Sequence, residues 1–576
     1  MSNFILKTLE TRELKLNTIR LRGFYGGKLR KGSGGGGSGD GFPQLPGDVT
    51  RWHFGGLTNE MMAAMDDPRI EDADHKGRFL SFKNFAWGGM SGVGGYTENY
   101  NSNRWYKVET RIDATWTYKS FNARSIKDNI AAQLFYQSKS SDTGFRVLSC
   151  TIKVSGLTDG QGIEYVSNGT QQFVIMRIEN DGIYHLPSFD FGAKNAYYGF
   201  RFLKLQESCN ITIEQLPLYP GALVFDGVDD RGTCDNFPIL TKEKGYTVVA
   251  LRQWITRGER ALGLVSNVKN WLKDGAFLLE YRNIQADHLN KPISFGAIGS
   301  EMDLPHILTY QTSKSYNGVL IATGNFEGTD VLHVGKLALT NVGTCINAAI
   351  WELVFLDHDA TEEELTKIKD YFVKTYPWLF PNQAWTVTGK TNEDEDRATI
   401  ANITGNGNDL VLSNFGFIEG SGYNEEGEYA GYLVTDGVDD SGRAVGLTIS
   451  KDFTLVGEWI LFSKTSVNAG LSIHPQIHIF NRPEVIQIIF RTAGKTLPVK
   501  SLKAICSDGR CYDENWSELK INVGEFTDNK GTLFVASNGT NYAQIAFKNL
   551  GIYNDQLLSK DDCIKAYNYL QTLKAK

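Results

Sequence analysis

Hydrophobic and polar positions alternate in short runs along much of this chain, a pattern typical of β-strands. Residues 149–155, Ser-Cys-Thr-Ile-Lys-Val-Ser, and 210–214, Asn-Ile-Thr-Ile-Glu, show this period of two. Asp-Gly and Asn-Gly turn signals stand between such runs. Helical spacing is found at 361–372 and 559–570, each beginning with a Thr or Ser cap and acidic residues. The pattern predicts an all-β, multidomain chain of tandem antiparallel β-sandwiches, the last two each ending in a short α-helix.

One phrase occurs twice, as Leu223-Val-Phe-Asp-Gly-Val-Asp-Asp230 and as Leu433-Val-Thr-Asp-Gly-Val-Asp-Asp440. Strand-like sequence and a similar tail, at 351–371 and 546–567, follow each copy. The lead-in of the last copy, 389–417, also resembles the segment at 56–87. Repetition at domain length indicates tandem modules, which suit adhesion and display better than a single catalytic centre.

Composition shifts along the chain predict six segments. They are a basic N-terminal attachment segment (1–31), a Gly-rich flexible linker (32–48), a β-sandwich domain (49–220), a first repeated module (221–381), a connecting segment (382–430) and a second repeated module (431–576). Residues 1–31 carry eight Lys or Arg against two Glu, a net charge of +6, although the whole chain has a net charge of −7.

The attachment segment has the features of a strand that adds to another protein. Residues 13–22 alternate apolar and polar positions, and an isolated strand cannot bury its apolar face without a partner. Its basic side chains, Arg12, Lys15, Arg20 and Arg22, favour an acidic protein surface. We expect no nucleic acid as a partner, because no nucleic-acid-binding signature accompanies the charge. The chain shows no signal-peptide core and no apolar run long enough to span a membrane, so we expect it to fold in a cytoplasm.

Cysteine usage gives no disulfide framework, because the seven cysteines are sparse and odd in number. Cys506 and Cys511 flank a Ser-Asp-Gly-Arg turn and are predicted to lie opposite each other on a hairpin. A cross-strand disulfide and two reduced buried thiols are both open there, and we favour the thiols.

The opening Leu-Val-Phe-Asp-Gly-Val-Asp-Asp motif and the helical ending, present in both copies, resemble the laminin-G-like, concanavalin A-like lectin/glucanase superfamily. The resemblance covers 223–376 and 433–570 and implies jelly-roll sandwiches of two curved antiparallel sheets. Arg231 and Ser441 depart from it, since the family usually has an aromatic residue there. The overall layout resembles structural proteins of tailed phages that infect Bacteroides-type gut bacteria. That resemblance implies a virion location, attachment to a capsid or tail protein, and a homotrimer.

The Asp-Gly-Val-Asp-Asp motif has two interpretations. Asp-Gly favours a tight turn in which Gly227 or Gly437 takes a positive φ, and the remaining aspartates can accept backbone N–H bonds. Alternatively, the carboxylates suit a structural calcium ion. We favour the turn for Asp226, Asp229 and Asp230 and for Asp436, Asp439 and Asp440, and we expect no other cofactor.

Catalytic signatures are incomplete in this sequence. Glucanases of the resembled fold use a Glu-x-Asp-x-x-Glu strand, but the nearest match, Glu301-Met-Asp-Leu-Pro-His306, contains Pro and lacks the last acid. A Gly-x-Ser-x-Gly nucleophile elbow is missing, and Pro475 prevents a helical metal pair of His474 and His478. We therefore expect a protein that is not an enzyme.

Exposed aromatic side chains among amides are the expected features of a glycan site. The Gly-loosened stretch 86–105 offers Trp87, Tyr96, Tyr100, Asn103 and Trp105 for glycan binding or for a contact between copies in an oligomer. The leading hypothesis is a non-enzymatic phage head or tail fibre that adheres to host-surface or mucus polysaccharide. A tailspike depolymerase and a bacterial surface lectin are the alternatives.

Overall fold

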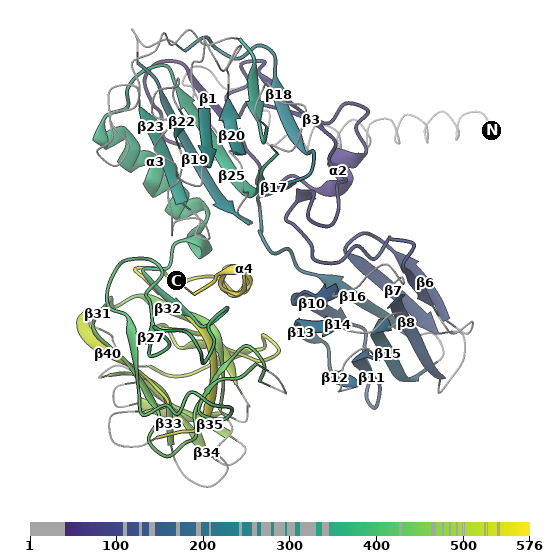
Figure 1. Cartoon of the computed structure of the whole chain (residues 1–576), viewed down its shortest axis with the longest axis vertical. Helices are drawn as coiled ribbons and strands as arrows, with labels where there is room; N and C mark the ends of the chain where they lie inside the picture. Colours follow the sequence, from purple (N-terminus) through teal and green to yellow (C-terminus); the bar gives the residue numbers. More distant parts are fainter. Residues whose placement is uncertain are drawn as a thin grey trace, which may run out of the picture.

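The computed structural model describes residues 41–575 with gaps (Figure 1). Between 256 and 344 the described residues are 262–266, 278–281, 294–295, 306–311 and 330–336. The attachment residues Arg12, Lys15, Arg20 and Arg22 lie outside the described part of the chain. The fold is all-β and multidomain, as the alternation predicts.

Module 1 is a sandwich of two sheets around an apolar core. Its inner sheet contains β1 (Val49–His53), β4 (Gly92–Val93), β17 (Leu223–Asp226), β19 (Thr247–Trp254), β23 (His306–Gln311) and β25 (Asn347–Leu356). Its outer sheet contains β2 (Arg69–Glu71), β3 (Phe79–Lys83), β18 (Arg231–Cys234), β20 (Leu262–Ser266), β21 (Leu278–Tyr281), β22 (Ser294–Phe295) and β24 (Leu332–Val334). Trp52, Phe225 and Leu353 are among the fully buried side chains between the sheets. A short helix, α2 (Asn59–Ala63), begins at the capping residue Thr58.

Module 2 repeats this arrangement. Its inner sheet contains β26 (Gln383–Thr386), β29 (Gly422–Tyr423), β30 (Leu433–Val434), β32 (Phe453–Leu461), β37 (Leu502–Cys506), β38 (Arg510–Asp513), β39 (Glu518–Lys520) and β41 (Ile545–Asn554). Its outer sheet contains β27 (Thr399–Ile400), β28 (Leu410–Ser413), β31 (Ser441–Ile449), β33 (Asn468–His474), β34 (Ile477–Arg482), β35 (Val485–Phe490), β36 (Ala493–Leu497) and β40 (Asn529–Val535). The pairing is the same in both modules: β1 and β17 share one edge of β25, and β26 and β30 share one edge of β41.

A separate sandwich is inserted into module 1, between β4 and β17. Its strands are β5 (Trp105–Lys107), β6 (Ile112–Trp116), β7 (Ser120–Ser125), β8 (Ile130–Gln137), β9 (Phe145–Val147), β10 (Cys150–Ser155), β11 (Gly162–Ser167), β12 (Val174–Ile178), β13 (Gly182–Leu186), β14 (Phe189–Phe191), β15 (Tyr197–Leu205) and β16 (Asn210–Gln215). They form two five-stranded antiparallel sheets and the pair β9–β14 around their own core. We call this unit the inserted domain.

Strand pairing corrects the predicted domain boundaries. Residues 49–96 were expected to belong to the first sandwich, but β1, β3 and β4 pair with β25, β18 and β17 of module 1. The predicted connecting segment 382–430 likewise supplies β26 to β29 to module 2. The backbone polar groups of these short strands need partners, and the partners lie far along the chain. Module 1 is therefore 41–96 with 217–381, module 2 is 382–575, and the inserted domain is 97–216.

The predicted flexible linker also ends earlier than expected. Phe42 is buried against Tyr371, with ring centroids 5.0 Å apart, and the Arg51 guanidinium carbon lies 4.3 Å from the Phe42 ring centroid. Residues 42–48 consequently belong to the packed body of module 1 and not to a tether.

The terminal helices cover the inner sheets and bring the modules together. α3 (Glu362–Thr375) begins at Thr361 with a capping box, and α4 (Lys560–Thr572) begins at Ser559, so both predicted helices are confirmed. A 3-10 turn, η2 (Pro377–Leu379), follows α3. One apolar cluster joins Leu251 of module 1, Phe372 of α3, Tyr553 of module 2 and Leu570 of α4. The modules therefore pack with their inner sheets facing the helices, and α4 lies between them (Figure 1).

The prediction that Cys506 and Cys511 lie opposite each other on a hairpin is wrong, because the strand partner of Cys511 is Ile505. Successive side chains on a strand point to opposite faces. Cys506 accordingly joins the cluster beside the helices, whereas Cys511 joins the core of the sandwich. The seven cysteines are free thiols in the structure. No helix in the described part of the chain is long and apolar enough to cross a membrane.

Candidate functional site

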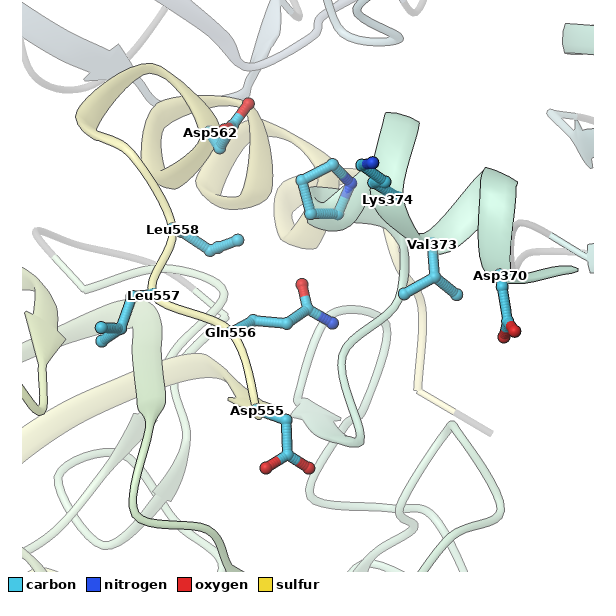
Figure 2. Close-up of a pocket in the computed structure, with 9 residues that line it drawn as sticks. Asp370, Val373, Lys374, Asp555, Gln556, Leu557, Leu558 and Asp562 are labelled. Carbon is cyan, nitrogen blue, oxygen red and sulfur yellow. The ribbon is translucent and has the colours of Figure 1, made fainter. Parts of the chain in front are cut away.

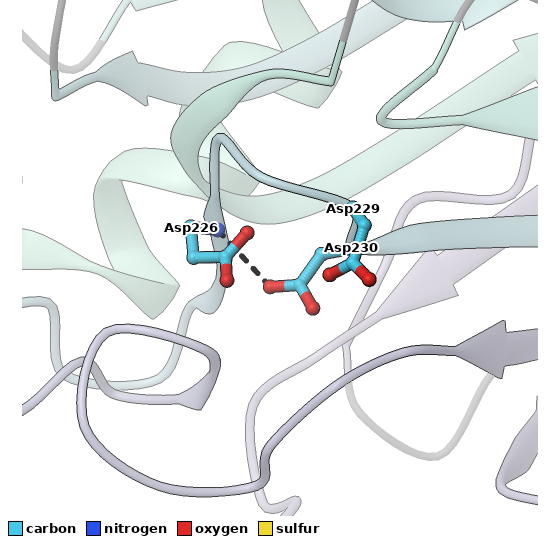
Figure 3. Close-up of side chains that lie close together, drawn as sticks. All are labelled: Asp226, Asp229 and Asp230. Carbon is cyan, nitrogen blue, oxygen red and sulfur yellow. Dashed lines mark hydrogen bonds between the residues drawn. The ribbon is translucent and has the colours of Figure 1, made fainter. Parts of the chain in front are cut away.

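The repeated aspartate motif forms the turn between β17 and β18 (Figure 3). The backbone N–H of Asp226 donates to Asp230 Oδ2 at 3.0 Å, and the N–H of Val228 donates to Asp226 Oδ1 at 2.7 Å. Ser91 Oγ donates to Asp230 Oδ1 at 2.9 Å. Gly227 takes a φ of +83°, the left-handed conformation that glycine adopts without steric cost. The motif thus joins the strand edge to the turn at 88–91.

The second copy has nearly the same bonds. The Asp436 N–H donates to Asp440 Oδ2 at 2.9 Å, and Asn414 donates to the Asp439 carbonyl at 3.0 Å, as Asn84 does to Asp229 at 3.1 Å. Gly437 has a φ of +77°. Hydrogen bonding that is repeated at this level indicates a shared structural role for the motif.

Burial raises the pKa of Asp230 to about 7. A carboxyl group of raised pKa is the kind that acts as a general acid, but Asp230 is completely buried and both its oxygens accept bonds from the protein. It therefore has no access to a substrate. Asp226, Asp229 and Asp230 each have one oxygen within 4.8 Å of the others, and Asp436, Asp439 and Asp440 form an equivalent group. Calcium binding by these groups stays a prediction.

The aromatic residues that were predicted to form a glycan-binding or oligomer-contact surface are buried. Trp87 stacks on Phe85, with centroids 4.8 Å apart, inside the core of module 1. Tyr100 and Trp105 lie in the core of the inserted domain, and Tyr96 is 7% exposed. Only Asn103 of the five is exposed. The glycines near them permit a close-packed turn, so the stretch does not form an open loop and the prediction of an exposed aromatic surface is corrected.

A different set of side chains crosses the outer sheet of module 2 in one row. Strand register places Arg443 beside Phe534, Phe534 beside Ser472, and Ser472 beside His478, on four neighbouring strands. These positions alternate with core residues such as Leu471 and Leu533, so the row faces away from the sandwich core. Arg443 is exposed, Phe534 and His478 are half-buried and Ser472 is 1% exposed. We call these four residues the outer-face row.

Two members of the outer-face row are in contact with each other. The Arg443 guanidinium lies over the Phe534 ring, 5.6 Å from its centroid, so the aromatic ring and the donors are held together. Ser472 Oγ has no hydrogen-bond partner among the described residues. In module 1 the equivalent positions hold Thr233, His333 and Ser266. No sequence motif marks this row, although the alternation of residues 441–449 indicates the outward position of Arg443.

Two further hollows lie along α4. A groove of about 330 Å³ separates α3 from the β41–α4 connection and is lined by Asp370, Val373, Lys374, Pro377, Asp555, Gln556, Leu557, Leu558 and Asp562 (Figure 2). Asp370 and Asp555 are exposed and come from different modules. A larger cavity of about 640 Å³ lies where the inserted domain meets module 2.

Buried charges connect the inserted domain to module 2. His185 of β13 contacts Thr151 Oγ1 through Nδ1 at 3.2 Å, and its Nε2 lies 3.5 Å from Lys548 Nζ. Burial, together with the Lys548 charge, lowers the pKa of His185 to about 3, so this ring is neutral at pH 7. Burial acts to raise the pKa of Glu458, but Lys503 at 3.1 Å and Lys548 hold it below the usual range. The junction is therefore held by a neutral His and a carboxylate paired with lysines.

Comparisons with known proteins do not assign a family. Neither a protein-family model nor a curated protein matches the chain. Among solved structures, a Trypanosoma rangeli sialidase in complex with sialic acid is similar over 87% of this chain and 98% of that chain, with 10% identity and a TM-score of 0.24. A truncated AlyQ with CBM32 and alginate lyase domains is similar over 58% of this chain and 92% of that one, with 9% identity and a TM-score of 0.17. Such low TM-scores carry no argument about function.

Proposed function

We propose that this chain is a non-enzymatic adhesion protein whose sandwich modules bind glycans, displayed as a head or tail fibre of a tailed phage. The outer-face row of module 2 is the observation that supports glycan binding. It places an exposed cation, a half-buried aromatic ring and a half-buried imidazole side by side on the sheet. A sugar needs an apolar face for its C–H groups and polar partners for its hydroxyls, and this row has both.

Display on a virion is supported by the order of the segments. The basic, alternating segment 1–31 precedes a Gly-rich stretch and then the packed body that begins near Phe42. The segment would attach by strand addition to an acidic capsid or tail protein. Fibres of the kind that this chain resembles are commonly homotrimers. A homotrimer would present three copies of each weak glycan site and so strengthen the overall binding. The superfamily suggested by the repeated motif, laminin-G-like and concanavalin A-like, is consistent with two sheets per module.

A role without catalysis is supported by the environment of the acidic groups. In the part of the chain that the structure describes, the groups of three close carboxylates are the two aspartate turns, and each contains one completely buried member. A glycosidase needs two carboxyl groups on either side of a substrate bond. The buried member of each turn is held by backbone donors of the protein, which supports a structural role for it.

Glycan binding is tested by applying the full chain to a glycan array. Titration calorimetry then measures the affinity of the chain for each glycan that binds it. We expect Arg443→Ala with Phe534→Ala to weaken binding at least tenfold. The matched control is Thr233→Ala with His333→Ala, which changes the equivalent positions of module 1. If the Arg443 and Phe534 variant binds the glycan as tightly as the native chain does, the assignment of the row is wrong.

Virion display is tested by mass spectrometry of purified particles. The full chain and a truncation that begins at Gly41 are expressed during infection, and the truncation keeps Phe42 so that module 1 remains intact. We expect the particles to contain the full chain and not the truncation. Absence of both forms from particles would rule out the fibre role and leave the glycan-binding test unaffected.

A further inference from the structure

The inserted domain carries two arginines on the outward face of one of its sheets. That sheet contains β5, β8, β11, β12 and β15. Strand register places Arg177 of β12 and Arg201 of β15 on either side of Glu164 in β11. The strand neighbours of Glu164, Ile163 and Tyr165, belong to the core, so the three charged side chains face away from it. The sheet therefore presents a row of Arg, Glu and Arg at its surface.

Glu164 holds both guanidinium groups in place. Its side chain is 2% exposed, its Oε1 lies 2.9 Å from Arg177 Nε, and its Oε2 accepts a hydrogen bond from Arg201 Nε at 2.6 Å. Arg201 Nη2 also donates to Oε2. Bonds between a guanidinium and a carboxylate are short and directional. The buried carboxylate consequently fixes the orientation of the two arginines before any ligand arrives.

Donor groups of both arginines remain available to a ligand. A guanidinium has five N–H donors. Arg177 uses its Nε and Arg201 its Nε and Nη2, and within the part of the chain that the structure describes the remaining guanidinium nitrogens have no acceptor. The Arg177 side chain is 66% exposed and that of Arg201 is 27% exposed. Arg177 in particular extends its donors into solvent.

The row has a positive charge that its own acid does not neutralise. Glu164 is the one acidic residue in the five strands of this sheet. Two guanidinium charges against one carboxylate leave one positive charge. Glu179, which follows β12, is exposed and forms no ion pair with Arg177 or Arg201 among the described residues. A ligand with a single anionic group would therefore match the row.

An exposed aromatic ring lies beside the arginines. Phe173 is 39% exposed, and the Arg201 guanidinium carbon lies 5.1 Å from its ring centroid. Gln133 of β8 stands next to Arg201 in the register and is half-buried, so an amide continues the row. A sugar needs an apolar surface for its C–H groups and polar partners for its hydroxyls. Phe173 and Gln133 offer these beside the positive charge.

We propose that this face of the inserted domain binds an acidic saccharide, whose sugar carries a carboxylate or a sulfate ester. The anionic group accepts bonds from the outward N–H groups of Arg177 and Arg201, as guanidinium groups commonly bind such anions. The sugar ring packs on the exposed part of Phe173. The site rests on the proposed glycan-binding function, lies in a different domain from the outer-face row, and gives the inserted domain a ligand class of its own.

The test is titration calorimetry of the full chain with three saccharides. They are a trigalacturonate, its neutral methyl ester and a sulfated trisaccharide. We expect at least one of the two acidic saccharides to bind, which identifies the anionic group, and the methyl ester not to bind. Binding by neither acidic saccharide would overturn the proposal. Binding of the methyl ester as tight as that of the trigalacturonate would show that the charge is not recognised.

Substitutions at Arg177 test the assignment of the site. Arg177→Ala should weaken acidic-saccharide binding about tenfold or more, because it removes a charged donor. The variant should fold, since Arg177 is mostly exposed and Arg201 remains paired with Glu164. Arg177→Lys keeps the charge without the planar fork and should give an intermediate loss. Arg124→Ala is the matched control, because Arg124 is exposed on β7 of the other sheet of the inserted domain. Unchanged affinity in Arg177→Ala would overturn the assignment.

Comparison with the outer-face row separates this proposal from the proposed function. Acidic-saccharide binding that is lost in Arg443→Ala with Phe534→Ala but kept in Arg177→Ala would overturn the site on the inserted domain and leave the proposed function standing. Binding that is lost in Arg177→Ala alone would support the site, whatever the outer-face row binds.

A substitution at Phe173 separates a saccharide from an acidic peptide. Phe173→Ala should weaken acidic-saccharide binding about threefold or more, because the ring supplies the apolar surface. The same substitution should have little effect on a triglutamate peptide, which needs only the charge. If the peptide binds through Arg177 and neither acidic saccharide binds, the assignment to a saccharide is overturned.

Discussion

Modules 1 and 2 share a framework and differ on their outer sheets. The strand pairing, the aspartate turn and the terminal helix are the same in both. By contrast, Thr233 and His333 of module 1 stand where module 2 has Arg443 and Phe534. A position that holds a turn or fills a core accepts few residue types. An outward position on a strand can change its residue type with the ligand. The comparison therefore separates what builds a module from what a module binds.

The largest effects are expected where the shared core is broken. Trp52 and Trp385 occupy the same register position, opposite Leu353 and Leu550, and both are completely buried. Trp52→Ala and Trp385→Ala should each cost about 3–5 kcal/mol, because a large cavity remains. Hydrogen exchange measured by mass spectrometry would locate each loss, and each should be confined to its own module.

Replacement by Phe sharpens this comparison. Trp385 Nε1 donates to the Asn408 carbonyl at 3.2 Å, whereas Trp52 Nε1 has no partner among the described residues. Trp385→Phe should therefore cost about 1 kcal/mol more than Trp52→Phe. Equal costs would show that the hydrogen bond contributes nothing.

The aspartate turns should show the next largest effect. Asp230→Ala and Asp440→Ala leave the Asp226 and Asp436 N–H groups without their acceptor, at about 1–3 kcal/mol each. Chemical denaturation of the two variants should give losses of similar size. A loss in one module alone would contradict the shared structural role.

The pH dependence of stability follows from the raised pKa of Asp230. Burial raises the folded-state pKa from 3.8 to about 7, so the folded chain holds this proton more tightly than the unfolded chain. This contribution is fully present below pH 4 and is lost as the pH rises through 7. Asp230→Asn, which cannot ionise, should flatten the stability curve between pH 4 and 8. An unchanged slope would contradict the assignment.

Smaller effects are expected at the helix caps, where the modules differ in detail. Thr361 and Glu364 form a reciprocal capping box on α3, with the Thr361 N–H donating to Glu364 Oε2 at 2.7 Å. Ser559 caps α4 through its hydroxyl. Thr361→Ala should cost about 1–2 kcal/mol and Ser559→Ala about 1 kcal/mol. Thermal unfolding measures both losses, and a larger loss of stability in Ser559→Ala than in Thr361→Ala would contradict the comparison.

Removal of the inserted domain should have the smallest effect on the modules. The chain leaves and re-enters module 1 at one place, where the Leu218 N–H donates to the Gly95 carbonyl at 3.0 Å and the Tyr219 N–H to the Gly94 carbonyl at 2.8 Å. Module 2 has the short segment 424–432 at the equivalent position. Replacing 97–216 with that segment should leave both modules folded, each with cooperative unfolding. Loss of folding would show that the insertion is integral.

The repeated elements could be predicted from the sequence because their signals are local. The Asp-Gly turn at 226–227 and the cap at Thr361 depend on neighbouring residues, and the alternation of 210–214 shows a strand directly. The assignment of β1 to module 1 could not be predicted in this way. Its partner β25 lies about 300 residues along the chain, and alternation does not specify which strand it will pair with.

The candidate site was harder to predict for a related reason. Trp87 and Tyr100 lie among glycines and amides, a composition that also suits an exposed loop, and only their packing shows that they are buried. The outer-face row joins residues 443, 534, 472 and 478 through register, so the row has no counterpart in the linear sequence. The cavity where the inserted domain meets module 2 likewise requires two domains to be placed side by side.

The back-to-back packing of the modules has a geometric consequence for adhesion. Because both inner sheets face the helices, each outer sheet lies on the face of its module that is turned away from the helix cluster. If both outer sheets carry ligands, one molecule binds two surfaces at once and acts as a cross-linker.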